Sequence, residues 1–98
     1  MNIVKTSDND KLTIAVEGRL DTTTAPELEA SIKESIEGVA SLVMNFENLE
    51  YISSAGLRVL LSAQKIMNKQ GSMVVTNVND DINEIFDVTG FSDLLTIE

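Results

Sequence analysis

Cysteine, histidine and tryptophan are absent from this chain of 98 residues, and each absence removes a class of function. Without cysteine there is no disulfide framework and no thiol nucleophile, and without both cysteine and histidine the usual ligands of zinc, haem and iron-sulfur clusters are missing. Without histidine there is no serine-histidine-aspartate triad. Catalysis would have to rest on carboxylates, lysine, serine or the single tyrosine, Tyr51. We therefore expect no metal and no other cofactor.

Positive charge is scarce, since seven Lys and Arg residues stand against sixteen Asp and Glu, for a formal net charge of -9. Such a chain repels phosphate backbones and anionic lipid headgroups, so neither nucleic acid nor a membrane is an expected partner. The five glycines are too far apart for a phosphate-binding loop. No apolar run approaches the roughly 20 residues that span a bilayer, and the N-terminal residues lack the layout of a signal peptide. We expect a cytoplasmic protein that is a monomer when free.

The length and the 43% apolar content predict one domain over residues 1–98. Apolar and polar residues alternate over 12–16, which predicts a strand with one buried face that stops at Gly18. A short β-branched stretch at 2–6 precedes it, and the turn-forming residues 7–10 lie between the two. The chain is therefore predicted to open with an antiparallel hairpin.

A first helix is predicted to start after Thr24. Thr24 and Glu27 have the spacing of a capping box, and Pro26 suits the first turn of a helix. Gly38 is a natural stop for this helix, because glycine is favoured just beyond a helix C-terminus.

Two apolar runs, 41–46 and 72–77, are too short for helices and do not alternate, which predicts central strands covered on both faces. Helical periodicity follows each run, over about 55–68 and 80–88, and residues 94–97 suggest a last edge strand. Strands that alternate with helices imply parallel pairing through right-handed crossovers. The expected fold is a single α/β domain whose mixed, mostly parallel sheet opens with the hairpin and packs against helices.

Two serines open the helix that follows the first central strand. With Leu57 at zero and about 100° per residue, Ser54 falls near 60° in the polar arc, close to Arg58 near 100°. Ser53 falls near 320° in the apolar arc. Ser54 is therefore predicted to face solvent and Ser53 the interior. Taken alone, such serines are explained by helix capping, because their oxygens accept bonds from free amides.

The residues before the serines, Glu47, Glu50 and Tyr51, are interpreted as solvated loop residues. No second acid at a defined spacing suggests a metal site or an acid-base pair. A nucleophilic Ser54 would have only Lys65 or a carboxylate as its base. We therefore do not expect an enzyme.

The segments ISSAGL at 52–57 and GRLDTTTAPELE at 18–29 resemble the STAS-domain anti-sigma factor antagonists. The resemblance extends from the opening hairpin to TGF at 89–91. The family motif is Asp-Ser-(Ser, Thr or Ala)-Gly-Leu, and its serine is phosphorylated by an anti-sigma factor that is itself a serine kinase. The resemblance implies that Ser54 is the acceptor and that Ser53 stands where the family usually has Asp.

The resemblance also implies a partner-binding surface next to the serine. In that family a Gly-x-Leu-Asp turn lies beside the acceptor, and Gly18 to Asp21 match it. From the residues alone, Asp21 is explained as the organiser of the turn before the first helix. The residues assigned to the partner contact are Asp21, Thr22, Ser53, Ser54, Ala55, Gly56 and Arg58.

The function implied by the resemblance is a non-enzymatic switch. The unphosphorylated protein would bind the anti-sigma factor serine kinase and release a sigma factor, and a serine phosphatase would reverse the phosphorylation that ends this binding. Phosphoserine brings about -1.5 to -2 charges, so a surface that fits a neutral hydroxyl should lose its partner. Arg58 is either a solvated residue or reaches the phosphate. The alternative is a STAS-type docking subunit of a signalling scaffold or a lipid-transport complex, without regulatory phosphorylation.

Overall fold

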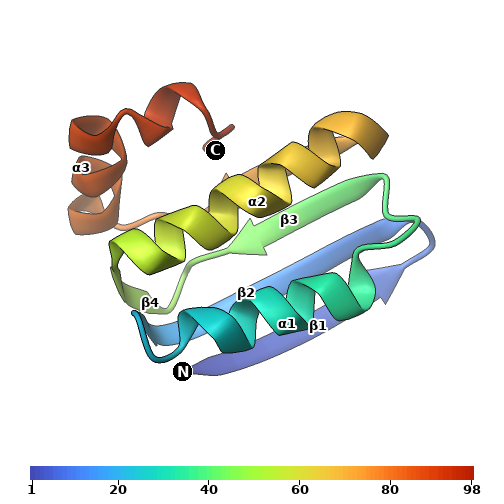
Figure 1. The fold of residues 1–98 in the computed structure, drawn as a ribbon, viewed down its shortest axis with the longest axis horizontal. Helices are drawn as coiled ribbons and strands as arrows, with labels where there is room; N and C mark the ends of the chain where they lie inside the picture. The colour runs from blue at the N-terminus through green and yellow to red at the C-terminus, as the bar shows by residue number, and fades with distance from the viewer.

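The computed structural model describes residues 1–98 and contains a five-stranded sheet with three α-helices and one short 3-10 helix (Figure 1). The elements in chain order are β1 (Asn2–Asp8), β2 (Lys11–Leu20), α1 (Ala25–Ser35), β3 (Ser41–Asn45), β4 (Leu49–Ile52), α2 (Ser54–Gln70), β5 (Ser72–Thr76), α3 (Asp80–Thr89) and η1 (Phe91–Asp93). The strand order is β1-β2-β3-β5, and β4 pairs with β2. β1 and β2 are antiparallel and the other pairs are parallel, which confirms the expected mixed α/β sheet.

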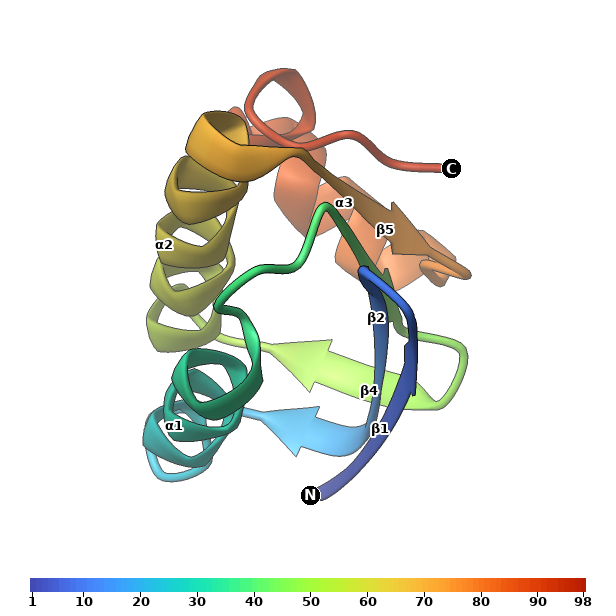
Figure 2. The ribbon, with the colours of Figure 1, turned by 90° about the vertical axis from the view of Figure 1, so that its right-hand side faces the viewer.

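The helices α1 and α2 lie side by side over one face of the sheet, as Figure 2 shows. Twenty-four buried hydrophobic residues between these two layers, and beneath α3, form one core. The prediction that the central strands are covered on both faces is wrong. In β3, Leu42 and Met44 are buried beneath the helices, whereas Val43 points the other way and is only half-buried. The reason is that both long helices pack on the same face.

The strand β2 does not stop at Gly18, contrary to the sequence-based prediction. Gly18 has a φ of +94°, and the register with β4 shifts between Gly18 and Arg19, so the strand bulges there and continues to Leu20. Residues 11–15 of β2 pair with β3, and residues 18–20 pair with β4. The bulge allows one long strand to serve two partners.

The strand β4 was not predicted, and the interpretation of Glu50 and Tyr51 as loop residues is wrong. Leu49 and Ile52 are buried while the two residues between them are exposed, so β4 lacks the alternation that marks a strand. Glu47 does lie in a turn, between β3 and β4, and is exposed. Pairing with β2, rather than a local pattern, makes this segment a strand.

Smaller differences occur near the two ends of the chain. β1 runs on to Asp8, so the predicted turn shrinks to Asn9 and Asp10, with Asn9 at a φ of 58°. The predicted edge strand at 94–97 is reduced to an isolated parallel bridge between Val75 and Ile97. The helices α2 and α3 begin and end within two residues of the predicted positions. None of the helices is long and apolar enough to cross a membrane.

Candidate functional site

The ends of β2 and β4 bring together the two segments that the sequence singled out. Leu20 is the register partner of Ile52, and the Ser53 amide donates a hydrogen bond to the Leu20 carbonyl at 2.9 Å. Asp21 follows Leu20 directly, and Ser53 follows Ile52 directly. The loop after β2 and the first turn of α2 therefore form one continuous surface, which is the candidate site.

The two serines at the start of α2 have different surroundings. Ser53 is the N-cap residue and is half-buried, and its Oγ accepts a hydrogen bond from the Gly56 amide at 3.4 Å. Ser54 is the first residue of the helix and is exposed, as the helical projection predicts. The amides of Ser54 and Ala55 donate to no group of the chain. Free amides at the positive end of a helix dipole favour an anion, so this end can accommodate a phosphate.

Gly56 lets the first turn of α2 approach the sheet closely. A Cβ atom at this position would lie 2.8 Å from Cγ1 of Ile52 and 2.8 Å from Cγ of Leu20. Both neighbours are fully packed in the core, with exposed fractions of 2% and 0%. Any larger residue would force these side chains, or the helix start that carries Ser54, to shift.

Asp21 organises the loop that follows β2. Its carboxylate accepts bonds from the Thr23 hydroxyl at 2.7 Å, the Thr23 amide at 3.0 Å and the Thr24 amide at 3.2 Å. The Thr23 hydroxyl, followed by the two backbone amides, holds the pKa of Asp21 below its ordinary value, although partial burial opposes this effect. The interpretation of Asp21 as organiser of the turn is confirmed.

The predicted capping box between Thr24 and Glu27 is wrong. Thr24 does occupy the N-cap position of α1, but its side chain makes no capping bond. Its hydroxyl instead accepts a bond from the Asp21 amide at 2.8 Å and donates one to the Arg19 carbonyl at 2.9 Å. The Thr24 hydroxyl is therefore not available to cap α1. Its two bonds instead fix the loop after β2 to the end of that strand.

The remaining predicted site residues lie on the same surface. Thr22 and Arg58 are exposed, and neither side chain bonds to another residue. Ala55 is half-buried in the first turn of α2. The structure therefore places all seven predicted contact residues at the joined ends of β2 and β4, with Arg58 one helical turn beyond Ser54.

One pair of residues at this site was missed. The Arg19 guanidinium lies 4.4 Å from the centre of the Tyr51 ring, and the two residues are register partners in the β2–β4 pair. Tyr51 is 36% exposed, so it offers an aromatic edge beside the site. The only signal in the sequence that could have revealed this pair was spacing. Arg19 lies two residues before Asp21, and Tyr51 lies two residues before Ser53, which is the relation expected of partners on parallel strands.

Comparison with known proteins agrees with this geometry. Residues 2–98 match the family model of the STAS domain. The anti-sigma-B factor antagonist of Staphylococcus aureus is 30% identical over 99 residues, which cover 99% of this chain and 92% of that protein. The structure of an anti-sigma factor antagonist from Mycobacterium paratuberculosis superimposes with a TM-score of 0.88 at 21% identity, over 98% of this chain and 83% of that one. Unphosphorylated SpoIIAA gives a TM-score of 0.78 at 19% identity, over 99% of this chain and 87% of that one. The match to the family model spans almost the whole sequence, and the chain therefore belongs to the STAS domain family.

Proposed function

We propose that this protein is a phosphorylation-switched anti-sigma factor antagonist. In its unphosphorylated form it binds an anti-sigma factor serine kinase and so releases a sigma factor. The observation that carries the proposal is the exposed Ser54 hydroxyl at the first residue of α2, beside the Asp21 loop. The Staphylococcus aureus relative is named for antagonism of an anti-sigma factor, and SpoIIAA has structures in both unphosphorylated and phosphorylated forms, which supports the same reading.

The local geometry supports a switch that acts on the contact surface and leaves the fold intact. A phosphate on Ser54 brings about -1.5 to -2 charges and three acceptor oxygens. The free amides of Ser54 and Ala55 and the helix dipole can accommodate this charge without unfolding α2. A partner that fits a neutral hydroxyl loses its contact, because it must now desolvate an anion. A serine phosphatase that removes the phosphate would restore binding.

The geometry also argues against Ser54 as the nucleophile of an enzyme. Lys65, the candidate lysine base, lies eleven residues after Ser54 on α2, which is about 16 Å along the helix axis. A general base must lie within about 3 Å, between heavy atoms, of the hydroxyl oxygen whose proton it removes, or reach it through one water. The hydroxyl is therefore proposed as an acceptor for the phosphoryl group of a kinase, and the cytoplasm, where sigma factors act, as its location.

The test uses each anti-sigma factor serine kinase of the source organism, purified singly and incubated with the protein and ATP. We expect one phosphate on Ser54 and none on Ser53, because the Ser53 hydroxyl is half-buried and used as a cap. Ser54→Ala should bind the kinase constitutively, whereas Ser54→Asp should weaken binding only in part, since its charge is smaller than that of phosphate. Ser62→Ala, on an exposed serine of the same helix, is the matched control.

Peptide mass mapping that places the phosphate on Ser53 would show that the assigned register is wrong. Kinase binding that is equal before and after phosphorylation would favour the docking subunit, in which phosphorylation plays no part.

A further inference from the structure

The helix α2 is a basic element in an acidic protein. It carries Arg58, Lys65 and Lys69 and no acidic residue. The rest of the chain has four basic residues and all sixteen acidic ones. Three basic residues and no acidic one give this helix an excess of positive charge, and exposed charges interact with one another over about 10 Å at 0.1 M salt.

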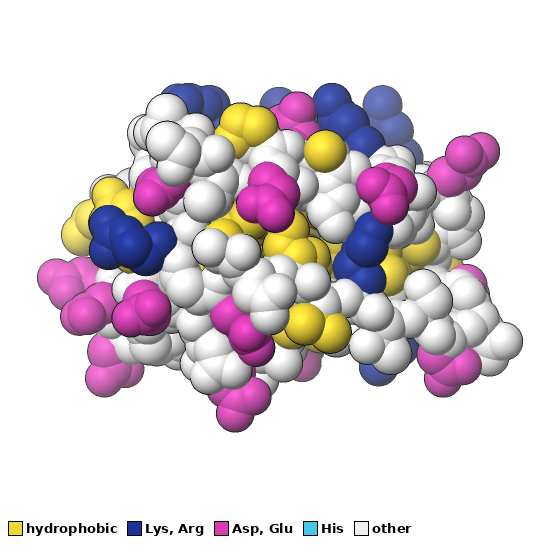
Figure 3. Space-filling model, turned by 90° about the horizontal axis from the view of Figure 1, so that it is seen from below, with side chains coloured by type: hydrophobic (Ala, Val, Ile, Leu, Met, Phe, Trp, Pro, Cys, Tyr) yellow, Lys and Arg dark blue, Asp and Glu magenta, His cyan; other side chains and the backbone are white.

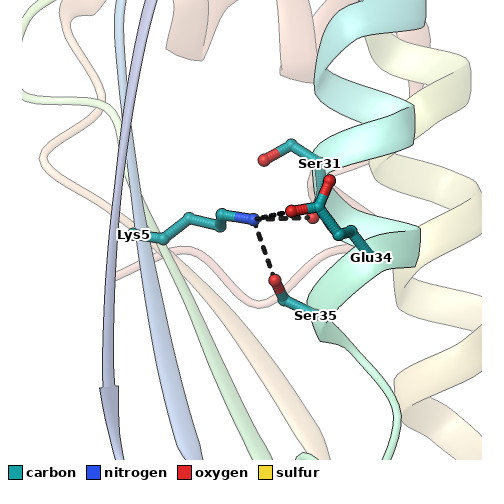
Figure 4. A network of polar contacts seen from close by, with 4 residues as sticks. All are labelled: Lys5, Ser31, Glu34 and Ser35. Atoms are coloured by element: carbon teal, nitrogen blue, oxygen red, sulfur yellow. Dashed lines mark hydrogen bonds and ion pairs between the residues drawn. The ribbon is translucent and has the colours of Figure 1, made fainter.

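Most of the cations outside α2 are already engaged. Lys5 reaches from β1 to the C-terminal end of α1, where its ammonium group bonds to a carbonyl, a carboxylate and a hydroxyl (Figure 4). Lys33 pairs with Glu29 at 3.2 Å, and Arg19 lies over Tyr51. In contrast, none of the three basic side chains of α2 forms an ion pair within the chain. Their charges are therefore available to a partner.

The free cations of α2 lie in line with Ser54. Ser54, Arg58, Lys65 and Lys69 follow at steps of four, seven and four residues, and on a helical projection they occupy an arc from about 60° to about 120°. All four are exposed. The row from the serine to the last lysine is about 22 Å long. In Figure 3, several Lys and Arg side chains lie along the upper border, which is the side of the helix layer, and others are scattered over the face together with the Asp and Glu side chains.

We propose that the basic stripe, defined as Arg58, Lys65 and Lys69, is the docking surface for an acidic face of the anti-sigma factor. This inference rests on the proposed function and adds the chemistry of the partner. Charge complementarity carries it, since this helix is the only place on a protein of charge -9 where several unpaired cations lie in one row, while Lys11 at the start of β2 stands alone. Complementary charges raise the rate of association and set the orientation of the two proteins.

The position of the stripe also explains why phosphorylation of Ser54 would weaken binding of the partner. A phosphate on Ser54 would stand one turn before Arg58, at the end of the stripe. Its charge of about -1.5 to -2 would outweigh that of the nearest cation and repel an acidic partner. Phosphorylation would thus remove the electrostatic attraction between the stripe and the acidic partner, and also the steric fit of the partner at the Ser54 hydroxyl.

The test compares two variants that change the net charge equally. The double substitution Lys65→Gln and Lys69→Gln removes two positive charges from the stripe. Lys11→Glu replaces one positive charge by a negative one at the start of β2, so the net charge falls by the same two units. Lys11 is exposed and points away from the helices, because its neighbour Leu12 is buried beneath them. Association of each protein with the anti-sigma factor kinase is followed by stopped flow at about 0.03 M and about 0.3 M salt, after melting curves have shown that both variants fold.

We expect the double variant to associate about tenfold more slowly than the parent at low salt, and the difference to shrink at high salt. Lys11→Glu should stay within about twofold of the parent, because its site lies outside the stripe. If the parent binds but the two variants slow association equally, the stripe is not the docking surface. If the parent binds none of the kinases, the proposed function itself fails. Self-association of the parent, or binding to duplex DNA, that the double variant loses would assign the stripe to another occupant and overturn the inference.

Discussion

Replacement of Gly56 by alanine should destabilise the protein, although alanine is the better helix former. The new methyl group would lie 2.8 Å from carbons of both Leu20 and Ile52, and 3.0 Å from a second carbon of Leu20. Contacts this short in a packed core force side chains or backbone to shift, which costs about 1 to 3 kcal/mol. Alanine regains up to about 1 kcal/mol through helix propensity. We therefore expect Gly56→Ala to lower the free energy of unfolding by about 1 to 2 kcal/mol, which is the middle of the range that the two effects span together.

Urea unfolding followed by circular dichroism measures this change directly. In a domain of this size each kcal/mol also lowers the melting temperature by about 4 to 8 °C. Where the backbone takes up the shift, the turn that carries Ser54 moves, and phosphorylation by the kinase should then slow as well. Ser62→Ala, an exposed position in the middle of α2, should change stability by less than about 0.5 kcal/mol.

A double-mutant cycle with Leu20→Ala tests the cause. Leu20→Ala removes two of the three carbon atoms that the new methyl group would meet, so Gly56→Ala should cost less in that background than in the parent. If Gly56→Ala leaves stability unchanged or raises it, the close approach of the helix to the sheet is not the reason for glycine here. An equal cost in both backgrounds would place the strain elsewhere.

Three further predictions address the same end of the molecule. Phosphorylation of Ser54 should raise the melting temperature less in Arg58→Ala than in the parent, and an equal shift in both would show that the arginine does not hold the phosphate. Asp21→Asn should flatten the loss of stability in acid. Because the pKa of Asp21 is lowered in the fold from the ordinary value of 3.8, the stabilisation by its carboxylate is present above that value and is lost as the pH falls through the lowered pKa. Melting temperatures of both proteins from neutral pH down to about pH 2 give this comparison, and parallel curves would refute it. Asn79→Ala should cost about 1 kcal/mol or more in urea unfolding, since its side chain caps α3 and also donates to β4, whereas Asn83→Ala, exposed on the same helix, should cost little.

The start of α2 shows what helix geometry alone can predict from the sequence. Ser54 was predicted correctly to be exposed, because successive residues of a helix turn by about 100° whatever surrounds them. The same argument placed Arg58 on the exposed face. Ser53 was predicted to face the interior but is only half-buried, because it is the N-cap residue with an extended backbone and lies outside the helix. Thr24 shows the limit of such an argument. Its spacing from Glu27 fits a capping box, but Asp21 and Arg19 compete for its hydroxyl, and that competition is not visible in the spacing.

The sequence by itself determined the order of most elements, the mixed parallel sheet, the exposed serine and the resemblance that covers the whole chain. These features depend on periodicity and residue type within a few neighbouring positions. Only the tertiary structure decided that residues 49–52 form β4, that β2 bulges at Gly18, and that Arg19 lies over Tyr51. Each of these depends on backbone pairing between segments about thirty residues apart, and such pairing leaves no local period to read. The candidate site exists because that pairing brings the two segments together.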